Sequence, residues 1–303
     1  MNIISKRLIS LKSLFFLSFF FLAFSSKSQN FKTLTYLEND TASLQLDLFL
    51  PQDKSVKDVP LMIFVHGGGF AVGNRTAGHS FGKYLAKNNV AYATISYTLS
   101  RKGIGFGCDT PQEDKIMAMR LAASELWEAT AFLLGKADEI GFDKNKVFIS
   151  GSSAGGEAVL HAAYLDRAKM SLHGNSLPSD FKYKGMISGA GAIIDLNLIT
   201  KETAMPTLFF HGNKDNVVPF VTASHHYCGP ERVGWMMLFG SEPIYNHLKS
   251  LDVSAQLQAF VGGKHEFAGW YFYRKQDVLL NFMNKVVAGE QFFISEEVVE
   301  SAK

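Results

Sequence analysis

Residues 147–165 read VFISGSSAGGEAVLHAAYL. The stretch passes from a short apolar run typical of a β-strand, through a cluster of glycine and serine, into an Ala- and Leu-rich run typical of a helix. Glycine costs backbone entropy, so its clustering here indicates a tight turn or a close approach of neighbouring backbone. Either one of the two serines is a nucleophile or the stretch is only a sharp corner.

Gly151-Ser152-Ser153-Ala154-Gly155 fits the pattern G-x-S-x-G, with Ser153 at its centre. That motif holds its serine on a strained strand-to-helix turn, so the hydroxyl projects from the C-terminal edge of a sheet. Ser152 occupies the first variable position and is expected to point away. The pattern also arises by chance as a structural turn, but the flanking strand and helix favour a nucleophile.

The rest of the chain alternates apolar strands with helices. Strands are expected over 44–50, 61–65, 90–97, 147–150, 185–190, 207–211 and 254–261. Helices are expected over 80–88, 112–140 with a break near Ala122, 157–168 and 277–287. This alternation predicts an α/β fold, a three-layer α/β/α sandwich with a mostly parallel central sheet.

No internal repeat or Pro- and Ser-rich linker divides the chain, so residues 29–303 are expected to form a single domain. Residues 222–251 are too long for a plain connection and are a candidate cap insertion. Residues 290–303 are expected to form a C-terminal tail.

Residues 1–28 have the pattern of a cleavable signal peptide. Basic residues up to Lys12 precede the apolar run 14–24, and small serines follow it. The run is too short to cross a bilayer of about 30 Å as a helix. We therefore expect a secreted or periplasmic protein with no stable membrane anchor.

Removal of residues 1–28 changes the charge of the chain. The full chain has 30 basic and 28 acidic residues, and the segment takes away four basic residues and no acidic one. The mature chain would be slightly acidic, without the basic stripe that binds nucleic acid. Cys108 and Cys228 can pair in an exported protein or remain free thiols, since the sequence does not supply the geometry of the bond.

A second glycine cluster lies in FVHGGGFAVG, residues 64–73, where a buried strand ends at His66. Such a loop can turn its backbone N–H groups toward the negative charge that develops on a carbonyl oxygen during ester cleavage. The alternatives are a plain glycine-rich turn or a phosphate-binding loop. Phe70 and Ala71 break the spacing of the dinucleotide-binding pattern.

A nucleophilic serine needs a base, and the base needs a carboxylate that orients it. Proteins with this serine motif carry them in the chain order Ser, acid, His. Asp215, in TLFFHGNKDNVVP (207–219), is the favoured acid, with Asp195 as the second candidate. His265, in AFVGGKHEFAGW (259–270), is the favoured base.

Three other histidines follow the serine motif at suitable positions. His225 and His226 could line the pocket from the insertion, and His247 is expected at the surface of a helix. The chain contains no H-E-x-x-H or C-x-x-C metal motif, so no metal and no cofactor is expected.

HGGGF (66–70), GSSAGG (151–156), HGNKDNVVP (211–219) and GGKHEF (262–267) together resemble the α/β-hydrolase superfamily. The similarity is to its carboxylesterase and acetyl-esterase group, which includes hormone-sensitive-lipase-like enzymes. The resemblance implies that Ser153 is the nucleophile, Asp215 the acid and His265 the base. It also implies that the backbone N–H groups of Gly68, Gly69 and Ala154 form the oxyanion hole.

The chain departs from the hormone-sensitive-lipase group at Ser152, where an aspartate is usual, and in the insertion at 222–251. We expect an exported serine hydrolase that cleaves short acyl or acetyl/feruloyl esters. Its partner would be a small-molecule or polysaccharide-linked ester. Apolar residues that could line an apolar or sugar-stacking pocket, or belong instead to the core or a lid, are Phe70, Trp235, Met236, Met237, Phe267 and Trp270.

Two other functions fit the same motifs. A peptidase of the prolyl-oligopeptidase type shares the fold and the triad, but such enzymes usually add a large propeller domain, for which 303 residues leave no room. A non-catalytic binding protein on a hydrolase fold typically lacks a triad member, whereas all three candidates are present here.

Overall fold

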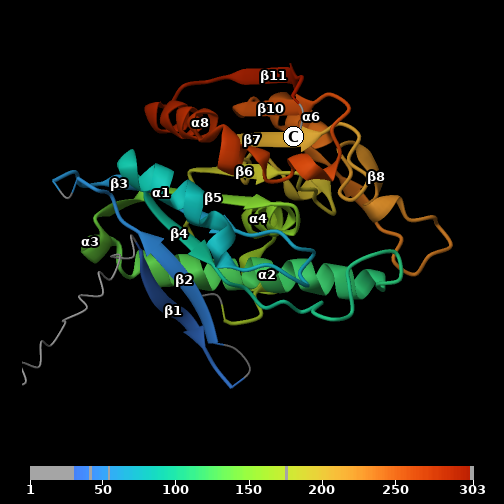
Figure 1. The fold of residues 1–303 in the computed structure, drawn as a ribbon, viewed down its shortest axis with the longest axis horizontal. Helices are drawn as coiled ribbons and strands as arrows, with labels where there is room; N and C mark the ends of the chain where they lie inside the picture. Colours follow the sequence, from blue (N-terminus) through green and yellow to red (C-terminus); the bar gives the residue numbers. More distant parts are fainter. Residues whose placement is uncertain (1–30, 41–42, 54, 175–176, 301–303) are drawn as a thin grey trace, which may run out of the picture.

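A twisted sheet runs through the whole molecule (Figure 1). The computed structural model describes residues 31–40, 43–53, 55–174 and 177–300, so the expected signal peptide lies outside the described residues. Within them, nine strands form one sheet in the order β1-β2-β4-β3-β5-β6-β7-β10-β11. These strands are β1 (Lys32–Glu38), β2 (Ser43–Phe49), β3 (Val59–Val65), β4 (Ala91–Ile95), β5 (Phe142–Ser152), β6 (Gly185–Gly189), β7 (Thr207–Gly212), β10 (Ala255–Phe260) and β11 (Phe293–Val298).

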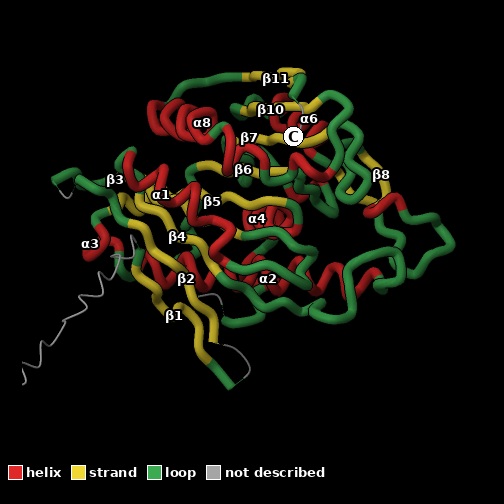
Figure 2. Tube along the Cα trace, viewed as in Figure 1, coloured by secondary structure: helices red, strands yellow, loops and turns green. Residues whose placement is uncertain are grey.

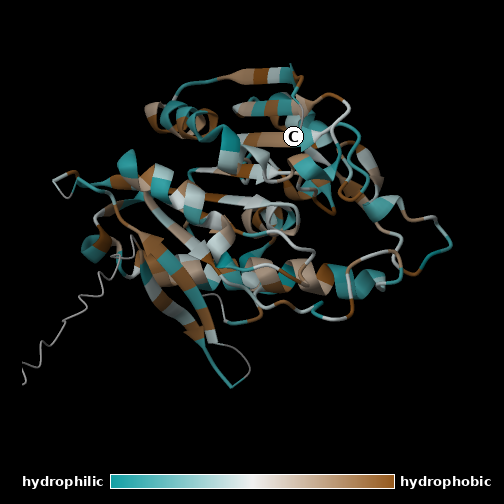
Figure 3. Cartoon of the chain, viewed as in Figure 1, coloured by the Kyte–Doolittle hydropathy of each residue, from teal (hydrophilic) through white to brown (hydrophobic). Residues whose placement is uncertain are grey.

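The sheet is parallel from β4 to β11 and antiparallel only where β2 pairs with β1 and β4. Every residue of β4, β6, β7 and β10 is buried. Strands of a parallel sheet are covered on both faces, which explains the mostly apolar sequences of β4, β6 and β7, whereas β10 buries Gln256 and Gln258 between its apolar residues. Figure 3 shows β7 mainly in hydrophobic colours and α8 in both colours, as expected for an interior strand and a helix with one buried face.

Helices cover both faces of the sheet, which confirms the predicted α/β/α class (Figure 2). Helices α2, α4 and α6 contribute to one apolar core, and α1, α7 and α8 contribute to the other. The α-helices are α1 (His79–Lys87), α2 (Gln112–Leu134), α3 (Ala137–Ile140), α4 (Ala154–Tyr164), α5 (Arg167–Met170), α6 (Ser241–Ser250), α7 (Trp270–Arg274) and α8 (Gln276–Ala288). Short 3-10 helices are η1 (Arg75–Gly78), η2 (Leu196–Leu198), η3 (His225–Tyr227) and η4 (His265–Phe267).

Helix α2 differs from its prediction, because it continues without a break through Ala122. Alanine is the strongest helix former, and this one is fully buried against the sheet. The helix ends instead at Leu134, before Gly135, and α3 follows as a separate short turn. Gly135 is thus the signal for the end of the helix, and it is easily missed because the residues around it within 112–140 are mostly helix formers.

The prediction that residues 290–303 form a C-terminal tail is wrong for most of the segment. Residues Phe293 to Val298 form β11, which pairs in parallel with β10. This strand is at the edge of the sheet, and its residues are mostly exposed or half-buried. Charged residues are common on edge strands, where they discourage pairing with other chains. The glutamates of the segment therefore hide its strand character in the sequence.

The candidate insertion at 222–251 consists of two parts. Strands β8 (Thr222–Ser224) and β9 (Met237–Phe239) pair as a small antiparallel sheet, with η3 in the connection between them. Helix α6 instead packs against β7 and β10 as an ordinary crossover helix. The additional structure is thus confined to residues 222–239, and a β-bridge between Ile193 and Phe239 attaches it to the domain.

Replacement of Gly155 by alanine tests the close contact between α4 and the sheet. A Cβ atom there would lie 2.1 Å from the carbonyl oxygen of Val65, so backbone must move. We expect a loss of unfolding free energy of about 1–3 kcal/mol, measured by chemical denaturation. Gly107→Ala is the matched control, because nothing lies within 4 Å of its added Cβ. Equal stability of the two variants would contradict the packing argument.

Candidate active site

The backbone at Ser153 has an unusual conformation, with φ 55° and ψ −126°. A non-glycine residue in such a region costs on the order of 1–3 kcal/mol. The turn is held by the Ser153 N–H, which donates to the Gly189 carbonyl of β6 at 2.7 Å. Added Cβ atoms at Gly151 and Gly155 would lie 2.2 Å and 2.1 Å from backbone carbonyl oxygens. The serine therefore sits on the strained strand-to-helix turn that its motif predicts.

Ser153, His265 and Asp215 form one hydrogen-bonded line. The Ser153 Oγ lies 2.7 Å from His265 Nε2, and His265 Nδ1 lies 2.7 Å from Asp215 Oδ2. They follow β5, β10 and β7, whose carboxyl ends meet at one edge of the parallel sheet. With a neutral imidazole, Nδ1–H donates to the carboxylate and Nε2 accepts from the serine hydroxyl. The structure thus brings together the three residues that the sequence singled out.

Asp215 is buried and fully hydrogen-bonded. Its Oδ1 accepts from the N–H groups of Val217 and Val218 at 2.8 and 3.1 Å, and His211 Nε2 lies 3.2 Å from Oδ2. Burial by itself would raise the pKa of Asp215, but the hydrogen bonds from His211 and His265 outweigh it and hold that pKa well below its usual value. The carboxylate therefore stays charged beside the imidazole.

His211 is a part of this network that the sequence reasoning missed. Its Nδ1 lies 2.8 Å from the hydroxyl of Ser241 at the start of α6. Since Nε2–H donates to Asp215, Nδ1 accepts from that hydroxyl. The only signal in the sequence is the position of His211 in the same HGNKDNVVP stretch as the acid.

The structure does not bring the alternative acid and base candidates to Ser153. The Asp195 carboxylate caps η2 by accepting from the Asn197 N–H at 2.9 Å. His247 is half-buried on α6 and donates to the Ile199 carbonyl at 2.8 Å. Both side chains have local structural partners away from the serine.

The glycine-rich loop after β3 lies beside Ser153. Gly68 and Gly69 have φ values of 118° and 59°, which side chains rarely adopt. The Gly68 carbonyl accepts from the N–H groups of Ala71 and Val72, both at 3.0 Å, which closes a turn. Gly68, Gly69 and Ala154, the predicted oxyanion-hole residues, all line the same cavity as Ser153.

That cavity has a volume of about 680 Å³. Its other walls include Phe106, Glu157, Val217, His225 and His226, so the two insertion histidines line it as expected. The apolar set proposed from the sequence does not line it. Phe70, Met236 and Phe267 are buried in the core, and Trp235 and Met237 are exposed. Trp270 is half-buried, and its Nε1–H donates to Glu300 at 2.8 Å.

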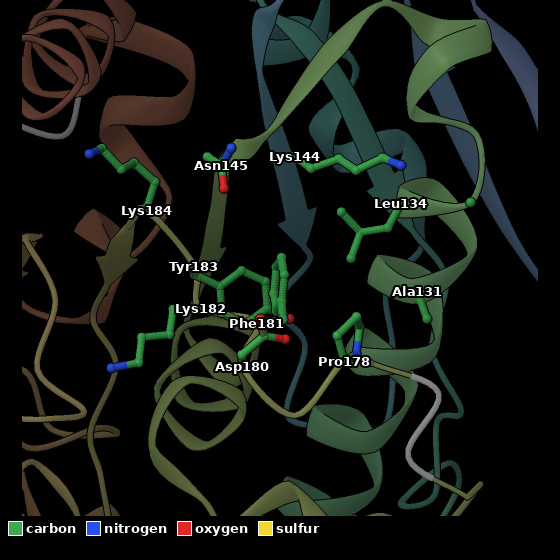
Figure 4. A pocket seen from close by; sticks show the side chains of 11 residues that line it. Ala131, Leu134, Lys144, Asn145, Pro178, Asp180, Phe181, Lys182, Tyr183 and Lys184 are labelled. Carbon is green, nitrogen blue, oxygen red and sulfur yellow. The ribbon is translucent and has the colours of Figure 1, made fainter.

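A second cavity, of about 650 Å³, lies elsewhere on the molecule (Figure 4). Lys144, Phe181 and Lys184 are among its lining residues, and they lie near the amino ends of β5 and β6. Ligands of parallel α/β sheets bind beyond the carboxyl ends of the strands, where Ser153 lies. Geometry therefore favours the serine cavity as the reaction site.

A disulfide joins two walls of the serine cavity. Cys108 directly follows the lining residues Phe106 and Gly107, and its partner Cys228 directly follows η3 of the insertion. The Gly234 N–H donates to the Cys108 carbonyl at 3.0 Å, which adds a backbone contact between the same segments. The sequence left this pairing open, and the structure forms it.

Two features are absent from the described residues. No group of three or more His, Cys, Asp or Glu side chains in that part of the chain is arranged to hold a metal ion. None of its helices combines the length and the apolar character that a membrane crossing requires.

Comparisons with known proteins agree on the fold. The BD-FAE family model matches residues 46–203. Esterase 2 of Thermogutta terrifontis, in a form phosphorylated by paraoxon, superposes with a TM-score of 0.64 at 18% identity, over 86% of this chain and 95% of that chain. The expected α/β-hydrolase fold is thereby confirmed.

Curated relatives agree with the expected group. Juvenile hormone esterase of Tribolium castaneum is 26% identical over 166 residues, which are 53% of this chain and 24% of that protein. Probable carboxylesterase 7 of Arabidopsis thaliana is 29% identical over 126 residues, 39% of this chain and 37% of that protein. The chain thus spans well under half the length of these relatives, and the resemblance to carboxylesterases is confirmed over the shared part.

Removal of the disulfide tests its role in holding the cavity. We expect the double variant Cys108→Ser, Cys228→Ser to lose about 2–4 kcal/mol of unfolding free energy, because the bond closes a long loop. Chemical denaturation measures that loss. A thiol assay of the unfolded, unreduced protein should find no free thiol, and two thiols per chain would show that the bond does not form.

Proposed function

The chain belongs to the BD-FAE family, and we propose that it is an exported serine hydrolase that cleaves carboxylic esters through an acyl-enzyme intermediate. The observation that carries the proposal is the line of hydrogen bonds from Ser153 through His265 to Asp215, at the edge of a cavity of about 680 Å³. The esterases among its relatives and structural neighbours support the same reaction class.

In the first half of the proposed reaction, His265 Nε2 takes the proton of Ser153 as the serine oxygen attacks the ester carbonyl. Asp215, held as a carboxylate, keeps Nδ1 protonated and stabilises the imidazolium that forms. His265 then gives the proton to the departing alkoxide, the C–O bond to the alcohol breaks, and the acyl group remains on Ser153.

In the second half, His265 Nε2 takes a proton from water, which attacks the acyl carbonyl. The C–O bond to Ser153 breaks, the serine oxygen recovers the proton, and the carboxylic acid leaves. Both halves form a tetrahedral oxyanion. We assign its stabilisation to the N–H groups of Gly68, Gly69 and Ala154, because Ala154 begins α4 and its N–H has no partner within the helix. One such donor contributes about 10²–10³ in rate.

Export is the second element of the proposal. It is supported by the basic and apolar pattern of residues 1–28 and by the disulfide between Cys108 and Cys228. Disulfides persist in oxidising compartments and are rare in the cytosol. A secreted or periplasmic location therefore fits both observations.

The proposed substrates are short acyl esters or acetyl and feruloyl esters, free or linked to a polysaccharide. The cavity volume falls within the usual range for small-molecule sites. It is large enough for a small acyl group or one aromatic ring. Phe106, which lines the cavity, is available to stack on such a ring.

Two adjacent serines provide a test of the nucleophile. Release of p-nitrophenol from the acetate and octanoate esters should fall by about 10⁴–10⁶ in Ser153→Ala, because the attacking oxygen is removed. Ser152 does not point away as expected, because it also lines the cavity, but only Ser153 bonds to His265. Ser152→Ala is therefore the matched control and should lose far less activity than Ser153→Ala. A comparable loss in Ser152→Ala would contradict the assignment of Ser153 as the nucleophile. The ratio of the rates on the two esters measures the acyl-chain preference.

Xylan fragments carrying acetyl or feruloyl groups test the substrate class. We expect release of acetate or ferulate from them, measured by chromatography and abolished in Ser153→Ala. Activity on simple esters with none on the fragments would reject the polysaccharide-linked substrates and leave free short acyl esters.

A further inference from the structure

One wall of the serine cavity contains buried polar atoms that form no hydrogen bond within the described part of the chain. Both carboxyl oxygens of Glu157 and the Nδ1 of His225 are buried without a hydrogen-bond partner among the described residues. The two side chains are 0% and 1% exposed, and both line the cavity. Buried polar groups are nearly always paired, so such a cluster beside a reaction centre indicates a place that a ligand completes.

Glu157 is close to the nucleophile in the chain and in space. It lies one turn after Ser153 on α4, and its N–H donates to the Ser153 carbonyl at 2.9 Å. Opposite it, His225 Nε2 is 3.4 Å from Glu157 Oε1, which is longer than an ordinary hydrogen bond. Glu157 on α4 and His225 on η3 are thus neighbours in the cavity wall, but the two side chains do not form a hydrogen bond with each other.

His225 is held in this position by its own contacts. Its backbone N–H donates to the Met236 carbonyl at 2.8 Å, and its ring packs edge-on against Phe106, with centroids 5.2 Å apart. The disulfide at Cys228 anchors the same short segment. The histidine is therefore a fixed part of the wall.

The charges around this pair favour a neutral ligand. Burial raises the pKa of Glu157 to about 8, and burial together with His226 and Lys115 lowers the pKa of His225 well below its usual value. Lys115 is itself buried and donates to the Gly234 carbonyl at 2.7 Å. At neutral pH both groups of the pair are mainly uncharged, and an ion would be bound at a large desolvation cost.

We propose that Glu157 and His225 form a hydroxyl-binding subsite, which selects esters that carry a free alcohol or phenol hydroxyl close to the scissile carbonyl. This inference rests on the proposed function. A hydroxyl is both a donor and an acceptor, so it can bridge a carboxyl group and an imidazole that do not reach each other. A substrate without the hydroxyl leaves these groups unpaired, and sites of this kind discriminate strongly against such analogues.

Matched ester pairs test the subsite. Methyl 3-hydroxybutyrate against methyl 3-methylbutyrate places the hydroxyl on the acyl side, and 2-hydroxyethyl butyrate against propyl butyrate places it on the alcohol side. In at least one pair, the ratio of kcat/KM for the hydroxylated ester to that for its isostere should fall about 10- to 100-fold in Glu157→Leu. The pair that responds identifies the side of the substrate that binds.

Two further variants distinguish a loss of selectivity at the subsite from a general disruption of the folded protein. Glu157→Gln keeps an acceptor oxygen and should retain part of the selectivity. Glu125→Gln changes another buried carboxyl, which bonds to Thr98 and does not line the cavity, so its ratio should equal that of the unsubstituted protein. Should Glu157→Leu fail to fold by circular dichroism, His225→Phe replaces it, with the same expected fall.

Unchanged ratios in both ester pairs would overturn the subsite. If the unsubstituted protein hydrolyses none of the four esters, the proposed function fails, and calorimetric binding of the esters to Ser153→Ala decides on the subsite separately. There the hydroxylated member of one pair should bind about 10-fold more tightly than its isostere, and equal binding of both members overturns the inference.

Discussion

The strained turn at Ser153 is the constraint on which the rest of the site depends. The unfavourable positive φ of Ser153 is maintained by contacts with the neighbouring strands. The N–H is bonded to β6, and Gly155 lies against the carbonyl of Val65 at the end of β3. No residue larger than glycine fits between α4 and that strand without moving backbone. The position of the serine oxygen is therefore set by the sheet, at the energetic expense of one unfavourable backbone conformation.

Asp215 holds His265, the proposed base, in a similarly fixed position. Four hydrogen bonds, from two backbone N–H groups and from two histidines, satisfy a carboxylate that would otherwise be costly to bury. Because the carboxylate accepts from Nδ1 of His265, the free electron pair of the ring is at Nε2, toward Ser153. His211 contacts the same Asp215 Oδ2 as His265 and so helps to fix the carboxylate, and Ser241 in turn orients His211.

Much of this could be predicted from the sequence, because parallel strands and glycine turns leave local signals. The apolar run before Ser153 and the chain order of Ser153, Asp215 and His265 needed no structure. β11 was missed because its glutamates are acceptable in a strand only at the edge of the sheet. The strand order, which places β11 at the edge, depends on residues far away in the chain. Glu157 was missed for the same reason. A glutamate near the start of a helix is usually exposed, and only the tertiary fold buries it.

The insertion and the sheet have different roles, because the sheet positions Ser153, Asp215 and His265 and the insertion forms a wall of the cavity. A crossover from β7 to β10 requires only α6, so the segment 222–239 is free to serve as a cavity wall. Such a segment has little core of its own, and without support it would open locally at small energetic cost. The disulfide to Cys108 and the Lys115 bond to Gly234 tie it to the residues just before and within α2. Because none of these ties involves Ser153, Asp215 or His265, the wall that we propose to contact substrate can change in sequence while the proposed reacting groups stay in place. We expect specificity to vary in the insertion and at the buried first turn of α4 beside it, and the proposed reaction to remain the same.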